Sequence, residues 1–212
     1  MPRQQVTIKT VYKLEELDEA AQQKAHEKWA EHNLDYEWWD FCYGMFNDAA
    51  KLLGIEIDTR PVKLMGGGTG QRYCIQFGDL YSQGEGASFE GDYRYHRRAL
   101  AKIKVEFPTT IALHRVALDL QRAQKPFLYK LQARVKHLGP IPGHRIEVWH
   151  GDDEYRDIPK LAREHLAQAL QDFMSWMNTT LKEEYEYLQS FEQFKEACGA
   201  NGYEFDDQGD IA

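Results

Sequence analysis

Basic side chains are concentrated in the middle of the chain, between Arg94 and Lys136. Eleven Lys and Arg residues in this segment, which we call the basic block, accompany only two acidic residues, Glu106 and Asp119. Aromatic faces beside Arg and Lys suit bases or nucleotides, and the block contains interleaved tyrosines. The block residues that we expect to bind a ligand are Arg94, His96, Arg97, Arg98, Arg115, Arg122, Lys130, Arg134 and Lys136.

The basic block stands out against an acidic chain. The 212 residues carry 26 Lys and Arg against 34 Asp and Glu, a net charge of −8. Residues 1–60 carry −5, residues 61–151 carry +7 and residues 152–212 carry −10. Such asymmetry indicates a basic face for nucleic acid, a nucleotide or an acidic protein. The alternative is that the acidic ends fold back and neutralise the basic middle, in particular through an acidic C-terminal helix.

A second motif is the run Ser82-Gln83-Gly84-Glu85-Gly86. As a turn it joins two strands, with the glycines supplying positive φ angles. As a site, its backbone amides and the side chains of Ser82 and Gln83 hold an anion or a base edge. It lacks the spacing and the Lys-Ser/Thr end of a phosphate-binding P-loop. The sequence is compatible with both interpretations.

Aromatic residues at the start of a predicted helix are candidates for a contact surface: Tyr36, Trp38 and Trp39. Neighbouring helical residues point about 100° apart, so the two tryptophans cannot both face inward. We expect one to pack in the core and the other to meet another element or a partner.

Spacing gives no support for catalysis or for a metal. The chain has eight histidines, but none stands in a His-Glu-x-x-His pattern, and Cys42, Cys74 and Cys198 form no Cys-x-x-Cys pair. There is no Gly-x-Ser-x-Gly nucleophile motif. We therefore predict no metal, no cofactor and no enzymatic activity. A nucleotide-directed enzyme, the weakest alternative, would need carboxylates or histidines that converge in a cleft.

Composition excludes several classes of protein. Aromatic residues make up 13% of the chain, which argues against disorder, and no apolar run is long enough to cross a bilayer. The first ten residues have no apolar core of signal-peptide length, and three scattered cysteines suit free thiols in a reducing compartment. We expect a cytoplasmic protein without a membrane partner.

The first third of the chain predicts mainly helices. Alternation over 5–13 favours a strand, and apolar spacing from Glu15 favours a helix that breaks at Asn33. A second helix from near Asp35 should end at Gly54. Ile55 and Ile57 then begin a short strand.

The rest of the chain alternates strands and helices. We expect strands over 72–77 and 87–95, and 99–107 is ambiguous between strand and helix. In 128–138, Tyr129, Leu131, Ala133 and Val135 fall on one side and Lys130, Gln132, Arg134 and Lys136 on the other. The remaining predictions are a helix over 109–124, a strand from His144 to His150, a long helix after Pro159 with an apolar seam to Leu188, a short helix over 191–198 ending at Gly199, and a last strand at 203–205.

Together these elements predict an α+β fold. An antiparallel or mixed sheet of hairpins would be packed by N-terminal helices and a long C-terminal helix. We expect one domain over residues 1–212, with a flexible glycine-containing loop at 59–71 and a mobile tail at 206–212.

Three stretches resemble a known family. They are 12–17 with 33–39, 82–91 with its Ser-Gln-Gly-acid-Gly-Ala core, and 183–188 with 201–205. They resemble small, mostly uncharacterised accessory proteins of tailed bacteriophages and prophages. That family usually has Asp where Glu85 stands. The resemblance implies a viral origin and a role in the infected bacterium, and it carries no catalytic residue.

Two functions follow as hypotheses. The first is a phage protein that binds and inhibits a host defence factor, such as an anti-CRISPR-like inhibitor whose partner is a host protein or ribonucleoprotein complex. The second is a protein that binds nucleic acid or a signalling nucleotide through the basic block. The oligomeric state is not encoded in any pattern that we recognise.

Overall fold

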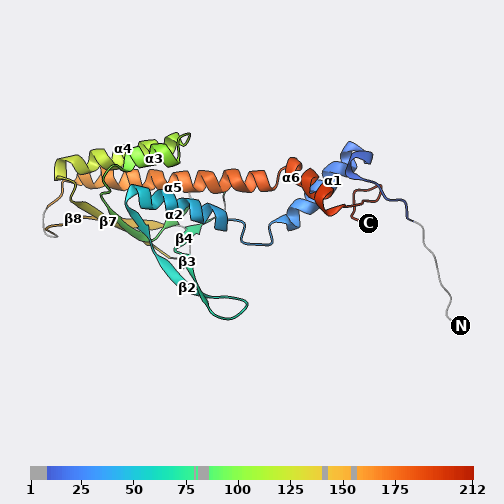
Figure 1. Ribbon diagram of the computed structural model, residues 1–212, viewed down its shortest axis with the longest axis horizontal. Coiled ribbons are helices and arrows are strands. Elements are labelled where there is room, and N and C mark those ends of the chain that lie inside the picture. Colours follow the sequence, from blue (N-terminus) through green and yellow to red (C-terminus); the bar gives the residue numbers. More distant parts are fainter. Residues whose placement is uncertain (1–8, 79, 81–85, 140–142, 154–156) are drawn as a thin grey trace. The chain divides into compact units, whose positions relative to one another are not determined.

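The computed structural model describes residues 9–78, 80, 86–139, 143–153 and 157–212 (Figure 1). They form two compact units, which we call the central unit, 39–182, and the terminal unit, 9–38 with 183–212. The prediction of a single α+β domain over residues 1–212 stays a prediction. Helix α5, Lys160–Leu188, contributes residues to both units.

The central unit is built on a four-stranded antiparallel sheet in the order β1–β6–β7–β8. Its strands are β1 (Ile55–Ile57), β6 (Gly91–Arg94), β7 (Leu131–His137) and β8 (His144–His150). The helices of this unit are α2 (Asp40–Leu53), α3 (Ala99–Glu106), α4 (Ile111–Gln124) and most of α5. The predicted α+β class is confirmed.

Alternating side chains along β7 give the sheet one face toward the core and one polar face. Leu131, Ala133 and Val135 are fully buried, as the sequence predicts, and the side chains between them lie on the other face. Figure 1 shows α4 and α5 running along one side of β7 and β8. Phe173 of α5 is fully buried and contacts Phe89 with ring centroids 5.8 Å apart.

Two small hairpins extend the central unit. The predicted loop at 59–71 is instead a hairpin of β2 (Thr59–Lys63) and β3 (Thr69–Tyr73), closed by a turn in which Gly67 and Gly68 have φ angles of 83° and 94°. The glycines allow the chain to reverse, so they mark a turn between strands. The other hairpin pairs β4 (Ile75–Phe77) with β5 (Ala87–Phe89).

The ambiguous segment 99–107 is helical, because α3 covers most of it. Ile103 is fully buried whereas Val105 is 74% exposed, so the strand-like alternation does not match burial. Four motif residues, Ser82, Gln83, Gly84 and Glu85, lie outside the described residues, and Gly86 is described directly before β5.

The terminal unit packs α1 (Glu19–Asn33) against α6 (Phe191–Asn201), with a short 3₁₀ turn at Leu14–Glu16. Asp18 caps α1 by accepting a hydrogen bond from the Ala21 N–H. The predicted end of α6 at Gly199 is wrong, since the helix continues to Asn201 and is capped by Gly202, whose φ of 66° suits glycine. The core consists of Leu14, Leu17, Ala21, Ala25, Phe194, Cys198 and Phe205.

Both ends of the described chain meet in the terminal unit. Of the strand expected at 5–13, the described residues 9–13 form one bridge, between Tyr12 and Phe205, and residues 5–8 lie outside the described part of the chain. The expected strand at 203–205 is likewise only bridged, with Phe205 also pairing Ile211. The tail predicted to be mobile, 206–212, folds back on α1, where Asp210 pairs with Lys28.

Candidate binding surface

The basic block divides into two groups, and the first lies on the polar face of the sheet. Arg134 of β7 stands directly across from Asp92 of β6, and its guanidinium lies 2.9 Å from the Asp92 carboxylate. It also pairs with Asp58, which follows β1. The hydrogen bonds to Asp58 raise the pKa of Arg134. The charge of Arg134 is therefore used inside the fold.

Two lysines beside Arg134 have partners as well. Lys136 lies 3.3 Å from Glu147 of β8, and Lys130 lies 3.1 Å from Asp152. We call Lys130, Arg134 and Lys136 the sheet-face cations. All of their carboxylate partners belong to the central unit. These cations are therefore neutralised by nearby carboxylates of the central unit, and their recorded ion pairs involve no residue of the acidic C-terminal helix.

The second group surrounds the turn between β6 and α3. It comprises Arg94, Arg97, Arg98, Lys102 and Lys104, all exposed, and we call it the basic rim. Within the described part of the chain, none of these five side chains forms an ion pair with a carboxylate. Five cations with no acidic partner attract anions from solution.

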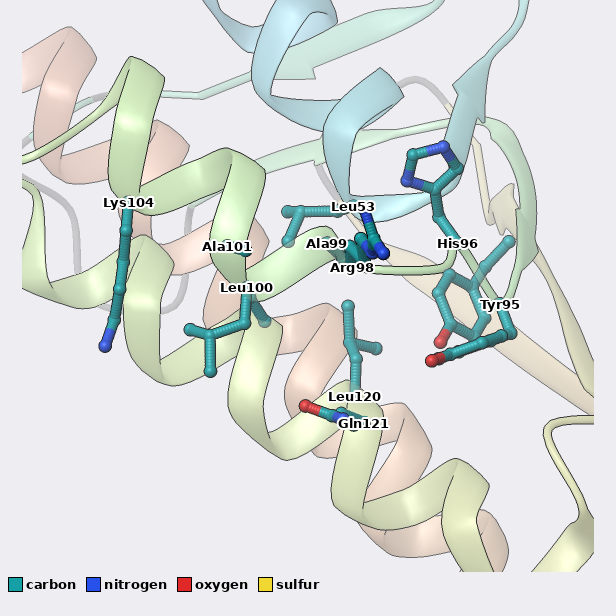
Figure 2. A pocket seen from close by; sticks show the side chains of 12 residues that line it. Leu53, Tyr95, His96, Arg98, Ala99, Leu100, Ala101, Lys104, Leu120 and Gln121 are labelled. Carbon is teal, nitrogen blue, oxygen red and sulfur yellow. The ribbon is translucent and has the colours of Figure 1, made fainter.

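The basic rim borders a cavity of about 330 Å³, which we call the α3 cavity. Figure 2 shows Lys104 at one end of this cavity and His96 and Tyr95 at the other. Apolar side chains of α2, α3 and α4, among them Leu53 and Leu120, complete its wall. The cavity thus combines apolar surface with cationic edges, the combination that holds a flat anionic molecule.

The floor of the α3 cavity is rigid. Tyr93 is 1% exposed, and burial raises the pKa of its phenol to about 12, so it stays neutral. The fully buried Gln124 donates a hydrogen bond to the Tyr93 hydroxyl at 3.4 Å and another to the Leu131 carbonyl at 2.7 Å. Its own carbonyl accepts from the Leu131 N–H. Gln124 therefore fastens α4 to β7 beneath the cavity.

Backbone geometry holds the rim in place. Gly54 ends α2 with a φ of 87°, and a Cβ there would lie 2.1 Å from the Arg94 carbonyl oxygen. Its own carbonyl accepts from the Arg94 N–H at 2.9 Å. This close approach needs glycine. It fixes the position of the end of β6, from which the residues of the basic rim follow.

His96 links α2 to α3. Its Nδ1 lies 3.1 Å from the Leu52 carbonyl and its Nε2 lies 3.3 Å from the Lys102 Nζ. A carbonyl only accepts and an ammonium only donates, so Nδ1 is the donor to Leu52 and Nε2 the acceptor from Lys102 in these contacts. His96 thereby positions Lys102.

Three non-glycine residues in left-handed conformations cluster near this site. Arg98, Leu128 and Tyr129 have φ angles of 63°, 52° and 64°. Each costs roughly 1 kcal/mol, and such strain collects at functional sites. Tyr129 packs against Tyr95 with ring centroids 4.3 Å apart and the rings tilted by 32°. The sequence predicts tyrosines beside the cations of the basic block, but the pairing of these two depends on the left-handed φ angles of Leu128 and Tyr129, which no sequence pattern indicates.

A second cavity, the β1 cavity, adjoins the first. It has a volume of about 610 Å³ and shares Tyr95 and His96 with the α3 cavity. Arg94 lines it, and so do Thr59 and Tyr73 at the base of the β2–β3 hairpin. The basic rim therefore faces two neighbouring hollows that are joined at Tyr95 and His96.

The remaining candidates lie elsewhere. Arg115 is exposed on α4, and Arg122 pairs with Asp119 one turn away at 3.1 Å. In the central unit, Trp39 contacts Phe77. In the terminal unit, Trp38 is buried against Tyr185 and Tyr36 is 56% exposed.

Two further searches concern the residues that the structure describes. They contain no group of three His, Cys, Asp or Glu side chains placed to hold a metal ion. None of the helices they form has the length and hydropathy needed to cross a membrane.

Comparison with known proteins places the chain in a family. Residues 38–208 match the family described as "Domain of unknown function (DUF8835)", and the chain belongs to it. No curated protein and no solved structure matches the chain.

Proposed function

We propose that this protein acts by binding a single-stranded nucleic acid through the basic rim, without catalysis. One observation carries the proposal: the sheet-face cations have carboxylate partners, whereas the described chain provides none for the five cations of the rim. Arg and Lys side chains left without acidic partners bind phosphate groups, which supply most of the affinity for nucleic acid.

The surface beside the rim suits bases that are not paired. Tyr95 and Tyr129 offer ring faces, and base–aromatic stacking contributes about 1–3 kcal/mol per base. The α3 cavity has apolar walls in which one unstacked base fits, with Arg98 and Lys104 at its edge for the adjoining phosphates. A duplex keeps its bases stacked, so we expect weaker binding to double-stranded DNA.

The biological setting that we propose is phage counter-defence, as the resemblance to phage accessory proteins implies. A host ribonucleoprotein defence complex presents single-stranded RNA together with protein. It is therefore the partner class in which the expected inhibitory role and the chemistry of the rim agree.

A direct test is fluorescence anisotropy with labelled single-stranded RNA, single-stranded DNA and a mononucleotide. The rim variant Arg97→Glu with Lys104→Glu should weaken binding to the single strands by roughly 100-fold or more, since two phosphate contacts become repulsive. The control is Arg163→Glu with Lys195→Glu, two exposed cations outside the block that give the same net charge change. It should change the affinity by less than about threefold.

Two results would count against the proposal. Equal loss in both variants would show only a general charge effect. Binding of the mononucleotide as tightly as the strands would favour the nucleotide-binding alternative.

A further inference from the structure

The β1 cavity contains a polar side chain that the fold leaves without a hydrogen-bond partner. Asn47 of α2 lines this cavity and is only 7% exposed. Its side-chain amide forms no hydrogen bond with the described part of the chain, and neither amide atom is sealed off from solvent. Nearly all buried polar groups in folded proteins have such partners. An amide that is mostly buried but still open to a cavity indicates that a ligand there supplies the missing hydrogen bonds.

Neighbouring residues of α2 hold Asn47 in place. Phe46 and Ala50 are fully buried, so the helix cannot turn the amide away from the cavity. Lys51, one helical turn after Asn47, lines the same cavity. Asn47 is therefore presented to a ligand in a fixed position, and a group that is already ordered loses little conformational entropy when it binds.

Glu56 of β1 supplies the same cavity with a hydrogen-bond acceptor. It is exposed and forms no ion pair within the described residues. It stands directly across from Asp92, whose carboxylate is paired with Arg134. An unpaired carboxylate repels phosphate and accepts hydrogen bonds from amino groups, so it favours a base with an amino group in this cavity. The exposed Arg94 and Lys51 suit the phosphates next to such a base.

We infer that the β1 cavity binds one base of the strand and that Asn47 selects adenine there, an inference that rests on the proposed function. An asparagine amide pairs with adenine through two hydrogen bonds, since its oxygen accepts from the N6 amino group and its nitrogen donates to N7. Glu56 offers an acceptor for the second hydrogen of N6. Uracil and cytosine have no N7, and guanine carries an acceptor, O6, in place of the amino group.

The position of the β1 cavity fits a strand that also occupies the α3 cavity. Tyr95 and His96 line both cavities, and Figure 2 shows them at the edge of the α3 cavity. Two consecutive bases would therefore occupy one cavity each, with Tyr95 between them. The adenine selected by Asn47 is then the direct neighbour of the base held in the α3 cavity.

The test uses uridine strands of equal length that differ at one central nucleotide. This nucleotide is uridine, adenosine, cytidine, guanosine or 7-deazaadenosine, which keeps the amino group of adenosine and lacks N7. Fluorescence anisotropy on the full chain measures each affinity at one salt concentration. The wild type should bind the adenosine strand roughly 5-fold or more tightly than the all-uridine strand, and 7-deazaadenosine should lose most of this preference.

Asn47→Ala should abolish the preference for adenosine and change the affinity for the all-uridine strand by less than about threefold, because no phosphate contact is removed. The variant loses an amide without a partner, so we expect it to melt at the same or a higher temperature. Asn201→Ala is the matched control, since Asn201 is exposed in the terminal unit and donates only to the Ala197 carbonyl. It should keep the full preference.

The outcomes separate this inference from the proposed function. If no strand binds the wild type, both fail. If all strands bind equally well, the inference alone is overturned, and the same holds for a preference for cytidine or guanosine or for a preference that survives in Asn47→Ala. Should Asn47→Ala unfold, the comparison of adenosine with 7-deazaadenosine on the wild type still decides, because equal affinities for these two strands overturn the role of Asn47.

Discussion

The sheet-face cations and the basic rim come from one stretch of sequence, and the fold treats them differently. Arg134, for example, is 27% exposed and sits between two carboxylates, whereas Arg97 is exposed and has no acidic partner among the described residues. The sheet-face cations are held by ion pairs with carboxylates on neighbouring strands or just beyond a strand end. The basic rim is held mainly by backbone geometry: Gly54 accepts a hydrogen bond from the Arg94 N–H, and Arg98 has a left-handed conformation. The His96 side chain adds a contact to the Leu52 carbonyl.

This difference shows that a count of charges along the chain does not by itself identify a binding surface. Cations that lie across a sheet from acidic residues contribute to the fold, and cations at a turn remain available to a partner. The following predictions test that division, beginning with the largest expected effect.

Replacing Gly54 tests whether backbone geometry builds the rim. Gly54→Ala should lower the free energy of unfolding by about 2 kcal/mol or more, because the added Cβ meets the Arg94 carbonyl and the φ of 87° is strained for alanine. Denaturant unfolding measures this. Gly199→Ala is the control, since a Cβ there meets nothing within 4 Å. Equal stability of the two variants would contradict the structure at Gly54.

Removing Arg134 tests the role of side-chain pairing on the sheet. Arg134→Ala should lower the free energy of unfolding by roughly 1 kcal/mol, since Asp58 and Asp92 lose their shared cation while all three groups stay partly solvated. Arg97→Ala, by contrast, should leave stability unchanged. If urea titrations found the two variants alike, the division between the groups would fail.

Replacing Arg98 separates binding from stability within the rim. Arg98→Gly should keep or raise the free energy of unfolding, by up to about 1 kcal/mol, because glycine removes the strain at a φ of 63°. The same change should weaken RNA binding. Parallel melting and anisotropy measurements check both, and a variant that melts earlier would show that the strain has been misjudged.

The imidazoles at the sheet end give a dependence on pH. Burial lowers the pKa of His137 and of His144, so the unfolded chain binds more protons than the folded one below the ordinary histidine pKa of 6.5. Stability should therefore be full above that pH and decline as the pH falls below it. Melting curves of His144→Gln should show a weaker decline, with the exposed His32→Gln as control.

Local patterns in the sequence predict much of the fold. The alternation of β7, the α4 stripe and the stop at Gly54 all appear where expected, because each depends on residues close in the chain. The hairpin of β2 and β3 does not follow from the sequence, since its glycines indicate a loop and the mostly exposed side chains of β2 show no apolar alternation.

The candidate site is harder to predict from sequence. Arg134 and Asp58 are 76 residues apart, and their pairing follows only once β1, β6 and β7 are known to be neighbours.

The most direct test of the division between paired and unpaired cations is the salt dependence of binding to single-stranded RNA. Each phosphate contact on a single strand contributes about 0.7 to the slope of log affinity against log salt concentration. We predict that neutralising the rim with Arg97→Gln and Lys104→Gln lowers the slope by about 1.4, and that Lys130→Gln with Lys136→Gln leaves it unchanged. Equal slopes in the two variants, or no measurable binding by the wild type, would contradict the account.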